Sequence, residues 1–518
     1  MKFPTQLRSL CLLGSFLLAP LSFVHAQYSN GQSASYVTGQ SNFVSGTANA
    51  GGTTNQSGFN TPTSIVIDSA SGKLFVSDTA NNRILRFASA AAFSSGAAAE
   101  AVIGQTDFTT GSATSASSST LSGPTGITLD SAGNLWVADT TYNRVLCFPS
   151  AVTVTSGTAT ASLVLGQPDF TTTTAGVNQY TMTGPRSVAV DDTGTLYVLD
   201  SGANRILTYA NAASLSNGAF ANGCFGQSNF LASTTGTTAS TFGASPKALS
   251  IDADGDLWVS DTANNRVLCF ESAASISNLG PNADIVLGQA DFNSGGNGTS
   301  QNSFKSPNGL TFDILGRLYV ADTGNNRVLV FDQPLTLSYQ ANASFVLGQQ
   351  TFNTGASGLS ASAFNTPTSA NYLSAGYIWV VDQGNHRALS FAITPGIPGV
   401  SFTHGMKLPS NKQRHFNFFI GNTGGSDEFT LKASIPSGTT KLAKLTFSFQ
   451  GVDITSALKA GTFVTPEFQS ESQKIVVKVA PKSADKGGTL KINVTATSVT
   501  NTANTVTTAV TAKLVKKK

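Results

Sequence analysis

The sequence predicts an all-β protein whose larger part is a six-bladed β-propeller, and three observations support this prediction. An Arg that opens an apolar run recurs with steps of 61, 61, 61, 61 and 60 residues. Each copy contains four short β-branched or aromatic runs bounded by Gly, Asn and Asp, which is the pattern of strands. No helical 3.6-residue period lies between these runs, so four antiparallel strands per repeat indicate a propeller blade and not a helical solenoid. The repeated residues are Arg83, Arg144, Arg205, Arg266, Arg327 and Arg387.

Each blade is expected to contain the same elements in the same order. A Pro opens the first strand, a tight turn leads to a second strand such as "LWVAD", and a four-residue turn leads to a third strand such as "NRVLCF". A variable spacer and a fourth strand that ends in "GQ" complete the repeat. The prolines are Pro62, Pro124, Pro185, Pro246, Pro307 and Pro367.

The order of these motifs predicts how the ring closes. The first "GQ" motif begins at Gly39, before the first Pro-led strand, and no copy follows the last third strand at 387–391. An open sheet edge would invite aggregation. Residues 35–40 are therefore expected to supply the outermost strand of the sixth blade.

Two stretches show the repeat in full: "PTGITLDSAGNLWVADTTYNRVLCF" at 124–148 and "PNGLTFDILGRLYVADTGNNRVLVF" at 307–331. They resemble the repeat of the NHL family of β-propellers, in which "P-x-G-I-x-x-D" is followed by "G-N-x-Y-V-A-D" and "N-x-R-V-x-x-F". The resemblance implies a six-bladed propeller that serves as a binding platform in most members. It also implies an alternative, because a minority of the family are lyases or related enzymes whose metal and base residues are added to the scaffold.

Two further segments flank the predicted propeller, which spans 27–393. Residues 1–26 have a basic start, an apolar core and a small-residue cleavage site near Ala26, as a signal peptide has. We therefore expect a secreted, periplasmic or cell-surface protein, and no later apolar stretch reaches membrane-spanning length. After the Pro/Gly linker "AITPGIPG", strand-like runs over 394–518 predict an immunoglobulin-like β-sandwich.

Charge is divided unequally between these two regions. Residues 27–393 contain 12 Lys and Arg against 21 Asp and Glu, whereas 394–518 contain 16 against 6. An acidic propeller lacks the clustered basic surface that nucleic-acid binding requires, so we predict no nucleic-acid partner. The basic C-terminal region is expected to contact the acidic propeller or an envelope polyanion, or simply to present a solvated Lys-rich face.

Cysteine and histidine usage predicts neither a disulfide framework nor a metal centre. Cys147, Cys224 and Cys269 lie in apolar runs and are expected to be buried free thiols. After cleavage only His386, His404 and His415 remain, which is too few for a His-ligated zinc site. Spare acids for carboxylate-only calcium binding are also few. We predict no catalytic residue, metal or cofactor.

A repeated acid precedes each repeated Arg by five residues, across the turn between the second and third strands. The pairs are Asp78/Arg83, Asp139/Arg144, Asp200/Arg205, Asp261/Arg266, Asp322/Arg327 and Asp382/Arg387. One substrate does not need six identical acid–base pairs, so a structural role is favoured, with the Asp accepting backbone N–H groups in the turn. A second set of acids is expected to cap the hairpin after the first strand, and Leu373 takes this place in blade six: Asp68, Asp130, Asp191, Asp252 and Asp313.

Differences between the blades point to a binding site. The residue after each Pro is expected at the mouth of the central channel, and these residues are Thr63, Thr125, Arg186, Lys247, Asn308 and Thr368. Arg186 and Lys247 place two cations on adjacent blades, which suits a carboxylate of an acidic sugar or a peptide terminus. The alternative is that they neutralise nearby Asp residues.

The polar loops before each Pro are expected to line this same side of the ring, here called the loop face. Tyr142 is the only aromatic residue in the turns between second and third strands, and Tyr180 lies in one of the loops. Exposed aromatic residues among Asn and Thr suit sugar stacking or a protein contact.

Together these features predict an exported, non-enzymatic propeller that binds a protein or glycan ligand on its loop face. The basic C-terminal module would anchor or space it. The alternatives are an enzyme of lyase or lactonase type that acts in the central channel, and a purely structural component of the envelope.

Overall fold

The structure is a computed structural model of the 518-residue chain. The residues that it describes are 29–89, 93–313, 316–332, 340–373, 377–392, 399–402, 408–409, 414–421, 429–435, 443–450, 452–465, 472–481, 488–498 and 505–515. The predicted signal peptide at 1–26 and the predicted domain boundary at 393–394 lie outside them. Within this part of the chain, no helix is both long and apolar enough to cross a membrane.

Six four-stranded antiparallel sheets form the propeller, as predicted. The innermost strands are β2 (Ile65–Ile67), β6 (Pro124–Leu129), β10 (Pro185–Val190), β14 (Ala248–Ile251), β18 (Pro307–Phe312) and β22 (Pro367–Leu373). The second strands are β3 (Lys73–Asp78), β7 (Leu135–Asp139), β11 (Leu196–Asp200), β15 (Leu257–Asp261), β19 (Leu318–Asp322) and β23 (Tyr377–Asp382). The alternation of turn residues and short apolar runs thus produces the strands that the sequence predicts.

The outer half of each blade follows the same plan. The third strands are β4 (Arg83–Ser89), β8 (Arg144–Phe148), β12 (Arg205–Tyr209), β16 (Arg266–Phe270), β20 (Arg327–Phe331) and β24 (Arg387–Ala392). The outermost strands are β5 (Ala101–Ile103), β9 (Leu163–Leu165), β13 (Gly223–Phe225), β17 (Ile285–Leu287), β21 (Phe345–Leu347) and β1 (Tyr36–Thr38). We number the blades 1 to 6 from β2 to β22.

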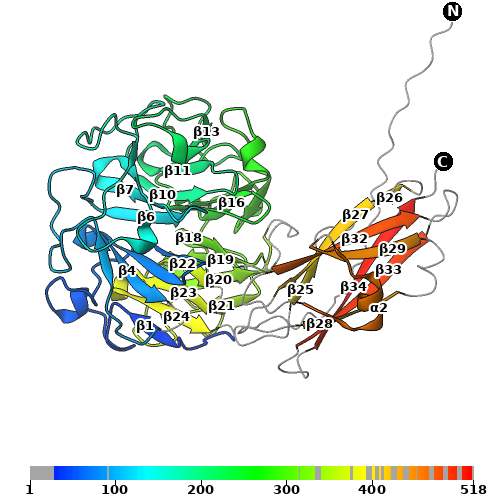
Figure 1. Cartoon of the computed structure of the whole chain (residues 1–518). Coiled ribbons are helices and arrows are strands. Elements are labelled where there is room, and N and C mark those ends of the chain that lie inside the picture. The colour runs from blue at the N-terminus through cyan, green and yellow to red at the C-terminus, as the bar shows by residue number, and fades with distance from the viewer. Residues whose placement is uncertain are drawn as a thin grey trace, which may run out of the picture.

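The ring closes through the N-terminal strand, as predicted. In blade 6 the strand order is β1-β24-β23-β22, and Tyr36 pairs with Ser390 in antiparallel register. Each innermost strand contacts those of the two neighbouring blades, and β22 contacts β2. Figure 1 shows this closure as the blue start of the ring lying beside its yellow end.

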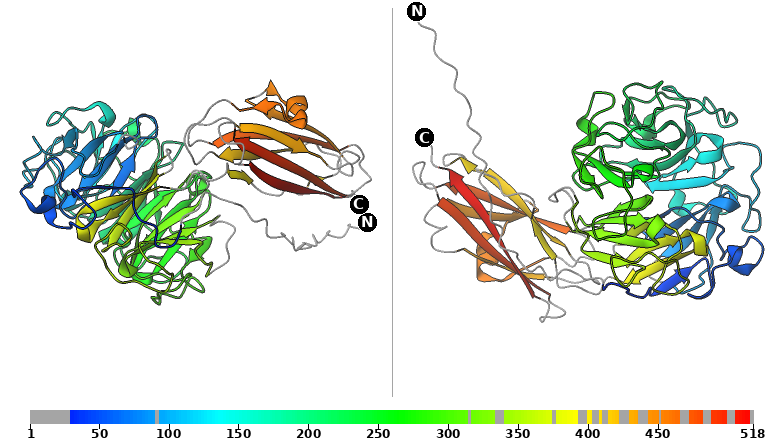
Figure 2. Two further views of the ribbon diagram at one scale, coloured as in Figure 1. Left: turned by 90° about the horizontal axis from the view of Figure 1, so that it is seen from below. Right: turned by 180° about the vertical axis from the view of Figure 1, so that it is seen from behind.

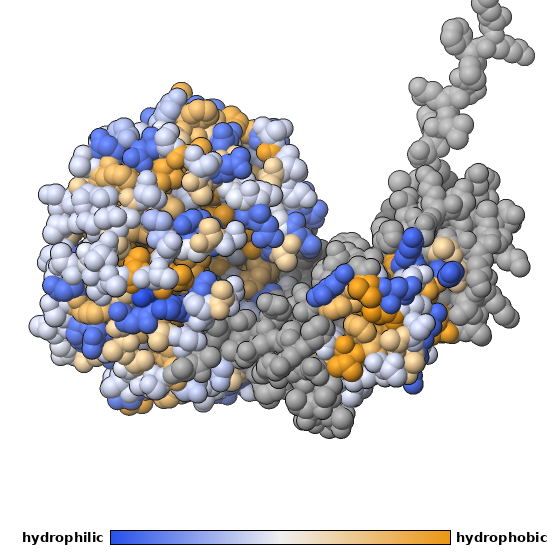
Figure 3. Space-filling view, in the orientation of Figure 1, coloured by the Kyte–Doolittle hydropathy of each residue, from blue (hydrophilic) through white to orange (hydrophobic). Residues whose placement is uncertain are grey.

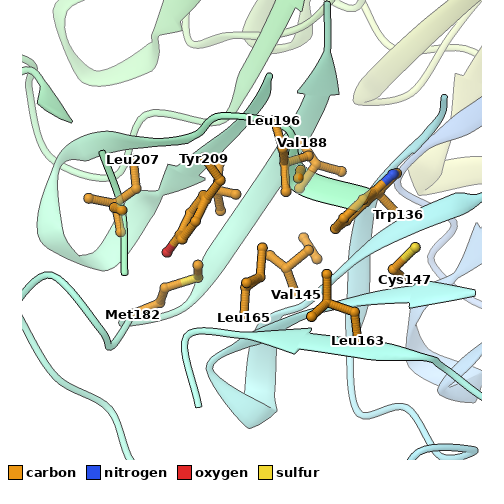
Figure 4. Packing of buried hydrophobic residues seen from close by; sticks show 14 of the residues in the cluster. Trp136, Val145, Cys147, Leu163, Leu165, Met182, Val188, Leu196, Leu207 and Tyr209 are labelled. Carbon is orange, nitrogen blue, oxygen red and sulfur yellow. The ribbon is translucent and has the colours of Figure 1, made fainter. Parts of the chain in front are cut away.

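The hydrophobic core is divided into clusters that lie between neighbouring blades. One cluster joins Leu163 and Leu165 of β9 to Leu207 and Tyr209 of β12, with Met182 of the intervening loop among them (Figure 4). All five side chains are at most 4% exposed. Each blade is therefore stabilised mainly by apolar contacts with its neighbours, which makes closure of the ring part of the stability of every blade.

The turn between the second and third strands is one turn of 3-10 helix followed by a left-handed residue. These short helices are η2 (Thr79–Asn81), η4 (Thr140–Tyr142), η6 (Ser201–Ala203), η8 (Thr262–Asn264), η10 (Thr323–Asn325) and η12 (Gln383–Asn385). The next residue has φ between 50° and 53° and is Asn82, Asn143, Asn204, Asn265, Asn326 or His386. Asn tolerates this conformation better than other non-glycine residues, which accounts for five of the six choices.

The C-terminal region contains two five-stranded sheets, which Figure 2 shows in orange and red. The first has the order β25 (Gly399–Phe402), β27 (Arg414–Gly421), β32 (Ser472–Pro481), β29 (Ala443–Phe449) and β30 (Val452–Asp453). The second has the order β26 (Leu408–Pro409), β34 (Thr505–Val515), β33 (Gly488–Ser498), β28 (Phe429–Ser434) and β31 (Phe463–Val464). Side chains of both sheets and of the short helix α2 (Thr455–Ala460) share one core. This is a β-sandwich, and its immunoglobulin-like character stays a prediction.

Candidate functional site

The repeated Asp and Arg residues form buried ion pairs that hold the loops of the loop face. In blade 3 the Arg205 Nε lies 2.8 Å from Asp200 Oδ2, and both side chains are fully buried. The guanidinium also donates to the backbone carbonyls of Thr181 and Phe230, in the loops on either side of the blade. Asp200 Oδ1 accepts the N–H of Thr183, which lies before Pro185, and not an N–H of the turn as we expected.

The other five pairs have the same Nε–Oδ2 contact, at 2.7 or 2.8 Å, and the same kinds of acceptor. Burial raises the pKa of Asp139 and of Asp200 to about 6, against the lowering effects of the paired Arg and of a backbone N–H. The paired Arg and the backbone N–H both favour the ionised form of each carboxylate. Removal of either partner would leave a buried charge uncompensated, which agrees with the structural role predicted for these pairs.

The sequence analysis missed the roles of two repeated residues, an Asn that joins each blade to the next and a Gln that binds this Asn within the blade. Asn143 Oδ1 accepts the N–H of Gly184 at 2.8 Å, and its Nδ2 donates to the Thr173 carbonyl at 3.0 Å. Gln167, of the "GQ" motif, donates to the Asn143 carbonyl at 2.9 Å. The preceding Gly166 has φ of 83°, and a Cβ there would meet the Met182 side chain at 2.9 Å. The regular recurrence of Asn and Gln at these places was the signal that could have revealed them.

The hydroxyl groups at the mouth of the channel are used between blades. Thr63 and Thr125 both donate to the carbonyl of the corresponding residue in the next blade, and Thr368 donates to the Thr63 carbonyl at 3.1 Å. These hydroxyls link blades 6, 1, 2 and 3 at the channel mouth, and the predicted role of the three residues in ligand binding stays a prediction. Asn308 accepts a hydrogen bond through its backbone carbonyl, from the Ser260 hydroxyl, and its side-chain amide makes no hydrogen bond with the described residues.

The channel itself holds about 280 Å³ and is lined by the innermost strands of all six blades. Arg186 and Lys247 are the only charged side chains among the described residues that line it. Burial lowers the pKa of Arg186, and burial together with the nearby Arg186 lowers the pKa of Lys247. No ion pair of either residue occurs in the described part of the chain. The alternative was that nearby Asp residues neutralise these two cations, but none of the described Asp residues forms an ion pair with either of them.

Tyr142 is not an open stacking surface. It is partly buried, its hydroxyl donates to the Thr114 carbonyl, and its ring lies 5.1 Å from the Arg144 guanidinium carbon. It therefore fastens a loop to the blade, and its place among the ligand-binding residues stays a prediction. Tyr180, in contrast, is 54% exposed.

The cysteines and the propeller histidine have structural environments. Cys147, Cys224 and Cys269 are buried and free, as predicted, and burial raises the pKa of Cys147 to about 12 and that of Cys224 to about 11. His386 Nδ1 accepts the N–H of Thr61 at 2.9 Å. His415 lies on β27, and His404 lies outside the described residues. No group of three or more His, Cys, Asp or Glu in the described ranges is arranged to hold a metal ion.

Figure 3 shows that the visible surface of the propeller consists mainly of residues of intermediate hydropathy, with strongly hydrophilic and apolar residues scattered among them. This agrees with the abundance of Ser, Thr and Gly in the loops.

Several solved structures are similar to this chain at low sequence identity. Virginiamycin B lyase from Staphylococcus aureus has 12% identity and a TM-score of 0.34, over 70% of this chain and 92% of that one. An auxiliary nutrient binding protein from Bacteroides ovatus has 13% identity and a TM-score of 0.40, over 67% and 72%. These likenesses are too weak to carry an inference about this chain. No curated protein matches the sequence.

A family model gives the decisive comparison. The model described as the teneurin NHL domain matches residues 55–331, which is more than half of the chain. In the structure this range runs from the loop before blade 1 to the third strand of blade 5, so the match falls on the repeat that the motifs define. The matched range contains five of the six recurring ion pairs. The chain therefore belongs to the NHL family of β-propellers.

Proposed function

We propose that this propeller is an exported binding protein that holds an anionic group of a protein or glycan ligand at the loop-face mouth of its central channel. One observation carries the proposal. Arg186 lies on β10 and Lys247 directly precedes β14 of the next blade; both are partly buried, and no carboxylate of the described residues lines the channel that they share. Burial of unpaired cations is unfavourable, and an anion that binds between them recovers this cost.

The chemistry of the two side chains suits a carboxylate. Arg presents a planar fork that binds both oxygens of a carboxylate, and Lys adds a point charge. Asn308, on the next blade, places an amide at the same mouth. Below these residues the channel wall is uncharged, so a sugar ring or a peptide end attached to the carboxylate would meet hydroxyl and apolar groups.

The C-terminal domain is proposed to anchor or space the propeller. Its exposed lysines support this role, and those whose side chains the structure describes as exposed are Lys432, Lys444, Lys459 and Lys478. An envelope polyanion or the acidic propeller would be attracted to such a surface, and the attraction would weaken with salt.

The electrostatic basis of the proposal can be tested without a ligand. Because Arg186 contributes to the lowered pKa of Lys247, Arg186→Gln should raise the pKa of Lys247. Isotope-labelled lysine and NMR titration would measure this change. An unaltered Lys247 titration would mean that the two cations do not share one site.

Binding would be tested with glucuronate, trigalacturonate and a pentapeptide that carries either a free or an amidated C-terminus. Arg186→Glu/Lys247→Glu should abolish binding of the anionic probes, because two attractive charges become two repulsive ones. The matched control is Lys305→Glu, which changes an exposed cation on the loop face just before Pro307. If the control and the double variant weaken binding equally, the channel mouth is not the site.

The alternatives make different predictions. An enzyme of lyase or lactonase type would carry a stoichiometric metal ion, which elemental analysis of the purified protein would detect. A purely structural component would bind none of the probes and would be retained on envelope fractions by the C-terminal domain.

A further inference from the structure

Blade 3 carries two exposed aromatic side chains that touch each other. Tyr180 is 54% exposed and Phe220 is 50% exposed. Their ring centroids lie 6.0 Å apart at an interplanar angle of 67°, an edge-to-face arrangement. Tyr180 belongs to the loop before Pro185, and Phe220 belongs to the segment that leads into the outermost strand β13.

The two residues occupy positions that can be compared in all six blades. Next to them, Ala221 donates its N–H to the Gln179 carbonyl at 2.9 Å. The same bond between spacer and loop recurs in the other blades: Ala99 to Gln56, Ala161 to Ser118, Ala283 to Ala239, Ala343 to Gln301 and Ala34 to Ala361. The loop residue after the acceptor and the spacer residue before the donor are therefore equivalent throughout the ring.

No other blade has an aromatic residue at either position. The residues equivalent to Tyr180 are Ser57, Ser119, Ser240, Asn302 and Ser362. The residues equivalent to Phe220 are Ala98, Thr160, Asn282, Asn342 and Ser33. Five blades make the same backbone link with small side chains, so the fold does not require the rings. Two departures from the repeat that meet in one contact indicate a function for the contact.

The surroundings of the pair restrict the kind of partner. The loop "TTTTAGVNQYTMTG" at 171–184 and the spacer "ANAASLSNGAFANG" at 210–223 contain no charged residue. The Tyr180 hydroxyl has no hydrogen-bond partner in the described part of the chain. Asn222 is exposed, and it uses only its Oδ1, as acceptor of the Ala210 N–H at 2.8 Å, in the hydrogen bonds described. Aromatic faces with neighbouring hydroxyl and amide groups suit the C–H surface and the hydroxyls of a neutral sugar.

We propose that Tyr180 and Phe220 form a stacking site for a neutral hexopyranose unit of a glycan. Neither residue lines the central channel, so this site is separate from the channel mouth and does not depend on the anion proposed there. An apolar peptide segment is the competing occupant, and the experiment below distinguishes the two.

Other blades supply the substitutions for the test. Tyr180→Ser and Phe220→Asn install the residues that blade 4 carries at the same places, so the fold should be retained. The full chain would be titrated with neutral hexasaccharides, namely cellohexaose, laminarihexaose, maltohexaose and mannohexaose, by calorimetry and saturation-transfer NMR. We expect at least one of them to bind, and the double variant to weaken its binding by about tenfold or more. Arg186→Glu/Lys247→Glu should leave this binding unchanged.

Three results would overturn the proposal. The first is that none of the hexasaccharides binds the wild-type protein with a Kd below about 10 mM. The double variant could instead weaken binding by less than about twofold. A third contrary result would be an apolar peptide that competes for the rings while no saccharide does.

A reciprocal variant tests whether the pair is sufficient. Ser240→Tyr/Asn282→Phe transfers both aromatic residues to blade 4, where the bond between Ala283 and Ala239 aligns the two segments. The number of hexasaccharide molecules bound should rise from one to two. An unchanged number would overturn the assignment of the site to these two rings.

Discussion

Blade 6 and the other five blades reach the same structure by different routes. Each of blades 1 to 5 is one continuous segment, whereas blade 6 combines β22, β23 and β24 with the N-terminal strand β1. The contacts that are local elsewhere therefore join residues more than 300 positions apart in blade 6, such as Gln40 and His386. Ring closure thus uses the same contacts as the other blades, but it requires the first and last segments of the propeller to come together.

At the ring closure the backbone geometry of the repeat is kept, but one repeated residue is different. His386 takes the place of Asn and has a φ of 51°, as the Asn residues do. Its Nδ1 accepts the Thr61 N–H, the contact that Asn143 Oδ1 makes with Gly184. The position thus requires a left-handed backbone and a hydrogen-bond acceptor, and either side chain provides both.

Elsewhere in blade 6 a repeated contact is lost. Trp136 and Trp258 donate their indole N–H to Asp130 and Asp252, the acids that cap the first hairpin. In blade 6 Leu373 replaces this Asp, and Trp379 Nε1 is buried without a partner among the described residues. A buried donor without an acceptor is destabilising, so blade 6 is locally weaker at this place.

The largest effect is expected from removal of a buried guanidinium. Arg205→Met and Arg387→Met each leave a buried carboxylate uncompensated, which should cost about 3–5 kcal/mol in the free energy of unfolding. Arg387 also donates to the Phe43 carbonyl of the N-terminal segment at 2.5 Å. Arg387→Met should therefore speed amide exchange in residues 36–38 more than Arg205→Met does, measured by mass spectrometry alongside urea unfolding.

Lys305→Met is the control for this pair of variants, because it removes an exposed cation and should change stability by less than about 0.5 kcal/mol. Equal protection of residues 36–38 in Arg205→Met and Arg387→Met would show that Arg387 does not hold the closing strand.

An intermediate effect is expected from the tryptophans. Trp258→Phe removes a hydrogen bond of 2.8 Å to the Asp252 carboxylate, whereas Trp379→Phe removes none. Because both changes shrink a buried side chain alike, Trp258→Phe should cost about 1–2 kcal/mol more than Trp379→Phe. Urea unfolding of both variants measures the difference, and equal losses would contradict the contrast between the blades.

The smallest effect is a pH dependence confined to the closure. Burial lowers the pKa of His386 from 6.5, and Asp78 opposes this shift. A proton therefore binds the unfolded chain better than the folded one, so the stability from neutral His386 is present above pH 6.5 and is lost as pH falls through its lowered pKa. His386→Asn keeps a hydrogen-bond acceptor that does not titrate. The stability of the variant relative to the wild type should therefore increase as the pH falls.

The comparison of interest is the difference in urea midpoint between wild type and His386→Asn from pH 8 to pH 5. Asn143→His should introduce the same pH dependence into blade 2, since it copies the closure contact there. A difference that stays constant with pH would refute the role assigned to the neutral imidazole.

Sequence reasoning succeeded where a feature repeats. The six ion pairs, the four strands per blade and the strand at 36–38 follow from motif spacing and order, because a period leaves few foldings that satisfy every copy. It did not indicate the hydrogen bonds that Thr63, Thr125 and Tyr142 make. Their partners are backbone carbonyls of the next blade or of a distant loop, and no pattern within one repeat indicates which group a hydroxyl will face.

The sequence alone therefore determined the architecture of this protein, since local strand and turn preferences repeated six times admit one closed ring. Only the tertiary structure decided which polar groups remain available. Arg186 and Lys247 are without a carboxylate because no acid lies on the innermost strands that surround them. Tyr180 and Phe220 touch because two segments about 40 residues apart are bonded side by side. Whether a side chain is free to bind a ligand depends on its neighbours in space, and those neighbours come from other blades and other strands.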